Sequence, residues 1–115
     1  MKEFIKVMKA LSDPARVKIM KMLQHKTMCV CEIQTALDKA QSTTSKHLKI
    51  LEDAGLITYQ KNGLWVNYQL ADGTQSAFAA SLISHLRHWL EDDSDIKVLV
   101  RQLPDIDRNI ILNRN

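Results

Sequence analysis

The feature that most constrains the fold is a helical pattern followed at once by two β-prone runs. Residues 41–54 repeat apolar or small side chains on one helical face, and Gly55 is expected to stop that helix. The runs 56–60 and 64–70 are rich in Ile, Thr, Tyr, Trp and Val. Lys61-Asn62-Gly63 joins them, and Asn-Gly is the dipeptide that favours a hairpin turn. A helix leading into a small β-hairpin is therefore predicted.

Three further helices are predicted before this unit. Apolar residues recur at helical spacing through residues 1–11, and Ser12-Asp13-Pro14 then supplies a cap and a first-turn proline. The second helix is expected to start near Pro14 and to continue to Leu23. A short third helix is predicted over Cys29 to Leu37, and a turn separates it from residues 41–54. The fold class is therefore mainly α with a small β-hairpin.

The C-terminal third predicts a long helix and a short one. Residues 74–90 form one amphipathic segment with more apolar surface than a single outer helix needs, so a partner subunit is expected to cover it. Residues 96–100 are expected to form a short helix before Pro104, and the last ten residues a loose tail. We expect one domain over residues 1–92 and a partly flexible extension over 93–115.

Composition narrows the class of protein. A chain of 115 residues with 45% apolar content suits one small domain whose core is completed by dimerisation. The excess of 16 Lys and Arg over 13 Asp and Glu favours a polyanionic partner. No stretch approaches the roughly 20 apolar residues of a membrane span, and the N-terminus does not resemble a signal peptide, so we expect a cytoplasmic protein. No phosphate loop or nucleophile motif indicates an enzyme.

Cys29 and Cys31 are the candidate ligands. In the cytoplasm thiols stay reduced, which favours a metal site or redox-active thiols over a structural disulfide. In a helix, side chains two residues apart point roughly 200° away from each other, so two sulfurs there can share one ion only after local unwinding. We therefore expect ion binding to melt the start of the third helix.

The chain resembles the ArsR/SmtB repressors in three segments over about residues 1–92. These segments are SDPARVKIMKML at 12–23, MCVCEI at 28–33 and the run from Ser45 to Leu56. The resemblance implies a winged helix-turn-helix homodimer, joined by its first and last helices. It also implies a repressor of a resistance operon that binds double-stranded operator DNA and leaves it when a metal or metalloid binds.

The Cys29-Val30-Cys31 motif resembles the arsenic and antimony site of the arsenical-resistance branch. Soft thiolates favour trivalent arsenic or antimony over oxygen-seeking cations, and no other cofactor is required. The best-known form of the motif has a third cysteine three residues later, where this chain has Gln34. Hydroxide or an exogenous thiol is the expected third ligand.

Other inducers remain as alternatives. A cadmium- and lead-sensing branch adds cysteines from an N-terminal extension, but residues 1–28 contain none. His25 is a weak candidate for a zinc ligand. The stronger alternative hypothesis is a redox-sensing repressor, in which Cys29 and Cys31 form a strained disulfide.

A zinc site on the last helix of the domain is a further alternative. His88 and Glu91 match the His-x-x-Glu half-site of a zinc-sensing branch. Gln75 and Ala77 stand where that branch has its other two ligands, and neither side chain binds zinc in that way. We expect His88 and Glu91 to lie at the dimer interface or on the surface.

The helix over residues 41–54 is the expected DNA reader, with some side chains reaching bases and others phosphates. Its candidate contacts are Gln41, Ser42, Thr43, Ser45, Lys46, His47 and Lys49. Lys61 and Asn62 at the hairpin tip are expected near phosphate or a minor groove. Thr44 should instead face the core, where its hydroxyl needs a backbone acceptor. A winged helix that binds only protein is the remaining alternative.

Overall fold

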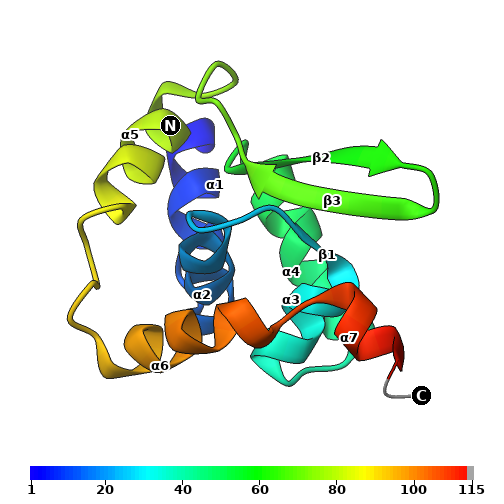
Figure 1. The fold of residues 1–115 in the computed structure, drawn as a ribbon. Coiled ribbons are helices and arrows are strands. Elements are labelled where there is room, and N and C mark those ends of the chain that lie inside the picture. Colours follow the sequence, from blue (N-terminus) through cyan, green and yellow to red (C-terminus); the bar gives the residue numbers. More distant parts are fainter. Residues whose placement is uncertain (114–115) are drawn as a thin grey trace.

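The computed structural model describes residues 1–113, in which helices surround a small antiparallel sheet (Figure 1). The N-terminal half consists of α1 (Lys2–Ala10), α2 (Pro14–Leu23), β1 (Met28–Cys29), α3 (Val30–Leu37) and α4 (Gln41–Asp53). The C-terminal half consists of β2 (Ile57–Asn62), β3 (Trp65–Leu70), α5 (Ala77–Leu86), α6 (Ser94–Gln102), the 3-10 turn η1 (Leu103–Asp105) and α7 (Arg108–Asn113). No helix in this described part is both long and apolar enough to cross a membrane.

The predicted cap of α2 is confirmed. The Asp13 carboxylate accepts hydrogen bonds from the backbone N–H groups of Ala15 and Arg16, at 2.8 and 3.2 Å. Pro14 occupies the first helical position, where a missing N–H costs nothing. At the other predicted boundary, α4 ends at Asp53 and Gly55 adopts φ +78 just beyond it. Helix α2 therefore starts, and α4 stops, within a residue of where the sequence indicates.

The hairpin is confirmed, but its turn lies one residue later than predicted. Strand β2 pairs with β3 so that Ile57 faces Leu70 and Asn62 faces Trp65. The two-residue turn is therefore Gly63-Leu64, with Gly63 at φ +63, as a type II′ turn requires at its first central position. Asn62 is not a turn residue but the last residue of β2.

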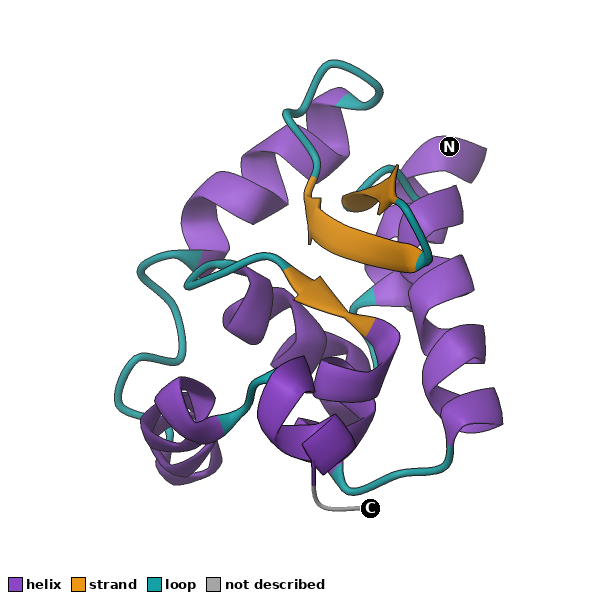
Figure 2. Cartoon of the chain, turned by 45° about the vertical axis from the view of Figure 1, so that its right-hand side comes forward, coloured by secondary structure: helices purple, strands orange, loops and turns teal. Residues whose placement is uncertain are grey.

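A third strand was not predicted. The two residues of β1 pair with β3, which places Met28 opposite Tyr68 and Cys29 opposite Asn67, and the sheet order is β1-β3-β2. Figure 2 shows this short strand leading directly into a helix. The prediction that α3 begins at Cys29 is therefore wrong by one residue, because Cys29 is still extended and α3 begins at Val30.

The predicted long helix over residues 74–90 is also wrong. Helix α5 ends at Leu86, and the chain then turns through Leu90, which has φ +64. The buried Lys21 side chain stabilises this end, because its ammonium group donates hydrogen bonds to the Leu86 and Trp89 carbonyls at 2.6 and 2.9 Å. These bonds satisfy carbonyls that a continuing helix would have used.

The expected loose tail is helical over much of residues 106–113. Helix α6 is longer than the predicted 96–100, and η1 and α7 follow it, with α7 lying beside α3 in Figure 1. The remaining residues of the expected tail, 114 and 115, lie outside the described residues. Local sequence signals miss α7 because its contacts lie far away along the chain.

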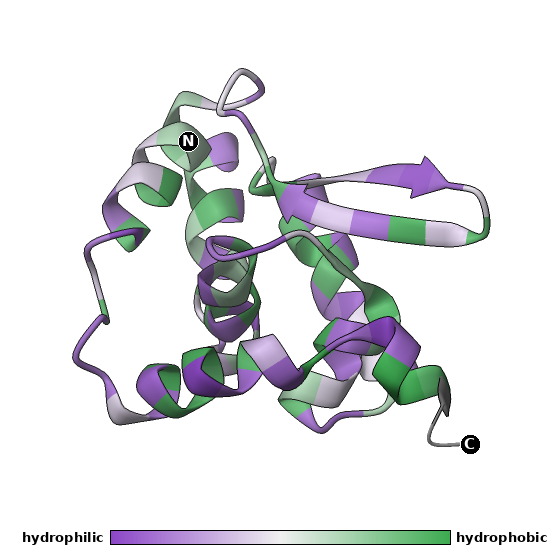
Figure 3. Cartoon of the chain, viewed as in Figure 1, coloured by the Kyte–Doolittle hydropathy of each residue, from purple (hydrophilic) through white to green (hydrophobic). Residues whose placement is uncertain are grey.

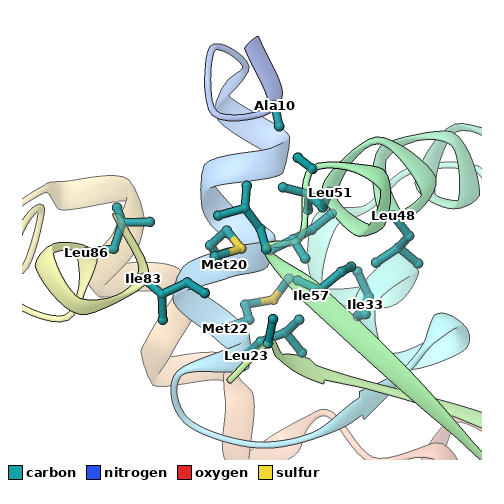
Figure 4. Close-up of a cluster of buried hydrophobic side chains, with 14 of the residues drawn as sticks. Ala10, Met20, Met22, Leu23, Ile33, Leu48, Leu51, Ile57, Ile83 and Leu86 are labelled. Atoms are coloured by element: carbon teal, nitrogen blue, oxygen red, sulfur yellow. The ribbon is translucent and has the colours of Figure 1, made fainter. Parts of the chain in front are cut away.

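The core lies around α2. Met20 and Met22 are almost fully buried and meet side chains of α4 and α5, including Leu51 and Ile83 (Figure 4). Burial of such side chains from water supplies most of the stabilisation of a small domain. Helices α3 and α4 form the helix-turn-helix, and the β2–β3 hairpin that follows them is the wing. The fold is therefore a winged helix-turn-helix.

Candidate functional site

The two cysteine sulfurs are already in contact. Cys29 Sγ and Cys31 Sγ lie 3.0 Å apart, with Cys29 only 2% exposed and Cys31 half-buried. They can meet because Cys29 is the extended N-cap residue of α3, with φ −85 and ψ 170, and not a helical residue. The expectation that the sulfurs meet only after the helix unwinds is therefore wrong.

Glu32 fixes the backbone of this thiol pair. Its carboxylate oxygen Oε1 accepts a hydrogen bond from the Cys29 N–H at 2.9 Å. A carboxylate at the third helical position that bonds the N-cap N–H is one half of a capping box. Glu32 was not predicted as a site residue, although its spacing from Cys29 carries the signal of this cap.

The surroundings keep the Cys29 thiol protonated. Burial, followed by the hydrogen bond with Cys31, raises the pKa of Cys29 to about 12. The negative charge of Glu32 acts in the same direction. At neutral pH Cys29 is therefore a neutral thiol, and any ligand that binds its sulfur must remove the proton.

The sulfur spacing limits which ions fit. With bonds of about 2.3 Å, the sulfurs at their present spacing subtend roughly 80° at a bound atom, well short of the tetrahedral angle of zinc sites. A trivalent pyramidal centre, whose bonds lie closer to right angles, fits this spacing better. No group of three or more His, Cys, Asp and Glu side chains within residues 1–113 is arranged to hold a metal. The pair therefore offers two sulfur ligands, and a third ligand would have to come from outside the chain.

The predicted DNA contacts on α4 are mostly exposed. These exposed side chains are Gln41, Ser42, Thr43, Ser45, Lys46 and Lys49. Thr44 is fully buried, as predicted, and its hydroxyl donates to the Ala40 carbonyl at 3.0 Å. The side chain of Lys49 forms an ion pair with Asp53 at 3.3 Å, so its charge is already partly neutralised.

His47 differs from the other predicted contacts, because it is half-buried and bound to α2. Arg16 can only donate, so its guanidinium donates a hydrogen bond to His47 Nδ1 at 3.2 Å. The same guanidinium donates to the carbonyls of Ala10 and Lys9. Arg16, which the sequence analysis did not select, therefore fixes the position of α4 relative to α1 and α2.

The wing carries its two predicted contacts on a strand. Lys61 and Asn62 are exposed near the end of β2, where Figure 3 shows hydrophilic colouring. Because neighbouring strand residues point to opposite faces, these two side chains project from opposite sides of the ribbon. Contact of either residue with DNA stays a prediction.

Comparison with known proteins identifies the family. Residues 13–59 match the model of bacterial regulatory proteins of the arsR family. The arsenical resistance operon repressor of Escherichia coli (strain K12) is 35% identical over 100 residues, which span 86% of this chain and 83% of that relative. The chain belongs to the ArsR family.

Further similar proteins cover parts of this chain, and one of them is named for resistance to cadmium and not to arsenicals. A homologue of the cadmium resistance regulatory protein CadC from Staphylococcus aureus is 41% identical over 68 residues, 58% of this chain and 56% of that relative. The structure of HlyU from Vibrio cholerae N16961 has a TM-score of 0.65 at 27% identity and covers 78% of this chain and 95% of that one. The sequence relatives are transcriptional regulators and not enzymes.

His88 and Glu91, the alternative zinc ligands, do not form a half-site within one helix. Helix α5 stops before His88 and Glu91, so these residues do not share a helical face. The Glu91 carboxylate is instead bound to Lys21 Nζ at 3.0 Å, and this hydrogen bond and charge lower the pKa of Glu91. Glu91 therefore has a structural partner that a zinc ion would have to displace.

Exposed apolar side chains lie on α1, at the start of α5 and just after the end of α5. Phe4 and Phe78 pack edge to face with ring centroids 5.4 Å apart, yet 37% and 42% of their surfaces remain exposed. Ile5, Met8, Trp89 and Leu90 are exposed to a similar degree. We name these six residues the α1/α5 apolar surface; such a group of large apolar side chains is typical of an interaction surface.

Proposed function

We propose that this ArsR-family chain is a repressor that leaves operator DNA when trivalent arsenic or antimony binds Cys29 and Cys31. The observation that carries the proposal is the pair of sulfurs 3.0 Å apart at the junction of β1 and α3. Helix α3 packs directly on α4, the predicted DNA reader. A ligand at this junction therefore acts on the element that positions α4.

Proton balance favours a metalloid over a divalent cation. Arsenous acid condenses with two neutral thiols, so that As(OH)3 and two RSH give (RS)2AsOH and two molecules of water. Each hydroxyl that leaves arsenic takes one thiol proton, and no proton is released to solvent. A divalent cation must instead displace both protons. With the pKa of Cys29 at about 12, that displacement costs far more at neutral pH.

The third ligand in this proposal is the hydroxide that remains on the metalloid, or an exogenous thiol. Gln34 lies one helical turn after Cys31 on α3, where a cysteine would supply a third sulfur. An amide side chain is a poor ligand for a soft ion. The site therefore binds by two thiols, and we expect weaker affinity than a three-thiol site gives.

The repressor is proposed to act as a homodimer through the α1/α5 apolar surface. Large apolar side chains gather there, and burying them against a second copy removes them from water. Two copies related by a twofold axis present two α4 helices, which matches a palindromic operator. Gln41, Ser42, Thr43, Ser45 and Lys46 are the proposed contacts of the reader, followed by Lys61 and Asn62 of the wing; the pairing of Lys49 and the packing of His47 weaken the case for those two.

A thiol-redox repressor is the second candidate, because the sulfurs are close enough to react with each other. Disulfide formation needs a thiolate as the attacking group. The raised pKa of Cys29 makes the Cys29 thiolate scarce at neutral pH, so this candidate requires Cys31 to be the attacking group. The test below separates it from metalloid binding.

The test is fluorescence anisotropy of the reduced protein on a DNA fragment from its own upstream promoter. Arsenite, antimonite, cadmium and zinc are titrated separately, and the double variant Cys29→Ser, Cys31→Ser is compared with the wild type. Typical coupling predicts 5- to 150-fold weaker DNA binding with arsenite or antimonite, and no change in the variant. Release by cadmium or zinc alone would favour the divalent alternative, and release by an oxidant that a reductant reverses would favour the redox one.

A further inference from the structure

The C-terminal segment crosses the polypeptide that carries the two cysteines. We name residues 103–113, which comprise η1 and α7, the C-terminal strap. One end is held by Lys26, whose ammonium group donates hydrogen bonds to the carbonyls of Leu103 and Ile106. Lys26 lies in the loop just before β1. The strap is therefore fastened on the N-terminal side of Cys29.

The other end of the strap is fastened through the same carboxylate that fixes Cys29. Glu32 Oε2 accepts a hydrogen bond from the Arg108 N–H at 3.2 Å, while Oε1 holds the Cys29 N–H at 2.9 Å. Glu32 is only 8% exposed, so water competes little for these bonds. One buried side chain thus joins the thiol pair to the strap.

Arg108 extends the connection to the wing. Its guanidinium donates to Asn67 Oδ1 at 3.2 Å and lies 4.7 Å from the ring centroid of Trp65. Cys29 is directly opposite Asn67 in the sheet, so their side chains stand on the same face, and Trp65 shares that face two residues along β3. Arg108 therefore covers the sheet face from which the Cys29 side chain projects.

From this arrangement we propose that the strap is a coupling device. A metalloid on Cys29 and Cys31 displaces Arg108 from Asn67 and Trp65, and so releases β3 of the wing. This inference rests on the proposed metalloid binding and adds a second path to DNA, separate from the contact between α3 and α4.

Packing explains why the strap is the part that moves. Protein interiors are close-packed, so an added metalloid and its hydroxide beside the buried Cys29 must push other atoms away. Met28 and Ile33, which flank the pair, are fully buried in the core. Arg108 is half-buried and held to the wing by one hydrogen bond and one cation–π contact. Displacing Arg108 therefore costs less than opening the core.

The test compares Arg108→Ala with Arg101→Ala in the full chain. Arg101 is exposed in the last turn of α6, and its side chain forms no hydrogen bond or ion pair with residues 1–113, so both variants remove one positive charge from the same extension. The measured quantity is the ratio of DNA dissociation constants with and without arsenite, after arsenite binding has been verified by titration. We expect the ratio to fall about 2- to 30-fold in Arg108→Ala and to stay at the wild-type value in Arg101→Ala.

Two outcomes distinguish failure of the strap proposal from failure of the proposed metalloid function. A wild-type ratio of one would overturn both the metalloid function and the strap. Wild-type release together with an equal ratio in Arg108→Ala would overturn the strap alone.

Amide hydrogen exchange of the unmutated protein gives a second measurement that does not depend on a variant folding. Arsenite is expected to speed exchange of the Arg108 amide, because its bond to Glu32 loosens when the strap moves. Unchanged protection of that amide with arsenite bound would contradict the displacement.

Discussion

The interior and the polar face of α4 use their polar groups in opposite ways. In the interior, Cys29, Glu32 and Lys21 are buried, and each has partners within the protein. On α4, side chains such as Ser45 and Lys46 are exposed, with no hydrogen bond to another residue of the described chain. The buried polar groups hold the surrounding backbone in one geometry, whereas the exposed groups of α4 remain free to bind another molecule.

This difference teaches where a substitution acts. Removing a buried polar group that has partners leaves those partners unpaired, so the free energy of unfolding changes. Removing an exposed polar group changes stability little and affects only what that group binds. The two regions should therefore separate cleanly into stability effects and binding effects.

The largest expected effect is on the reactivity of Cys29. At pH 8 the thiolate fraction falls about a thousandfold when the pKa rises from 9.0 to about 12, because only the deprotonated form reacts. Alkylation of Cys29 by iodoacetamide should therefore be about a thousandfold slower in the native protein than in urea, and should keep accelerating above pH 9. Mass spectrometry of the labelled peptide measures this rate. Equal rates in both states would show that Cys29 is not held as a neutral thiol.

The next effect is on stability. Lys21→Met keeps most of the side-chain volume but leaves the Leu86 and Trp89 carbonyls without donors. We expect unfolding to become easier by about 1 to 3 kcal/mol, measured by urea denaturation. Lys18→Met, on a half-buried position of the same helix, is the matched control and should change much less. A loss in Lys18→Met as large as that in Lys21→Met would contradict the argument.

The same variant predicts a change in acid stability. Lys21 lowers the pKa of Glu91 in the folded state. This contribution is present above the ordinary glutamate pKa and is lost as pH falls through the lowered value. Urea midpoints measured between pH 7 and pH 3 should therefore fall less steeply in Lys21→Met than in the wild type. An unchanged pH dependence would mean that the ion pair does not form in solution.

A smaller effect is expected at the proposed metalloid site. Gln34→Cys places a third thiol one turn from Cys31 and should raise arsenite affinity on the order of tenfold, because the third ligand becomes intramolecular. Ala36→Cys, which lies about 140° around α3 from Cys31, serves as the control for simply adding a thiol. Isothermal titration of reduced protein with arsenite measures both, and equal gains would argue against α3 geometry as the cause.

The smallest effect is on the DNA side. Lys46→Met should weaken binding a few-fold and reduce the salt slope of binding by about 1, as loss of one phosphate contact does. Lys49→Met should change both less, since Lys49 is already paired with Asp53. Anisotropy titrations over a range of salt concentrations measure the slopes, and a larger change for Lys49 would reverse this ranking.

The sequence predicts those parts of the fold that depend on interactions between residues close together in the chain. The α2 cap, the buried Thr44 and the hairpin depend on neighbours close in sequence, and periodicity or turn chemistry found them. The early end of α5 depends on Lys21, which lies 65 residues before Leu86. No residue near Leu86 in the sequence indicates that the helix ends there, so the periodic pattern predicts a continuous helix.

The sequence selects Cys29 and Cys31 as candidate ligands, which stays a prediction, but it does not predict how their sulfurs are arranged. The Cys29-Val30-Cys31 motif and the resemblance select both residues. Strand β1 has only two residues, which is too short to show the alternating pattern of a strand. The sequence therefore assigns Cys29 to the helix and predicts that the two sulfurs lie apart. Pairing with β3 keeps Cys29 extended and brings the sulfurs together. The sequence does not predict α7 either, because the residues that contact Arg108 of α7 are distant from it in the chain. These residues are Glu32, Asn67 and Trp65.

The bond between Glu32 and Arg108 also sets an order of events during protein synthesis. The two residues are 76 positions apart, which corresponds to roughly 4 to 15 seconds of translation at the usual rate of elongation. During that interval Cys29, Cys31 and Glu32 already exist while Arg108 has not been made. In a nascent chain the Glu32 carboxylate can therefore hold the Cys29 N–H before Arg108 is present to share it.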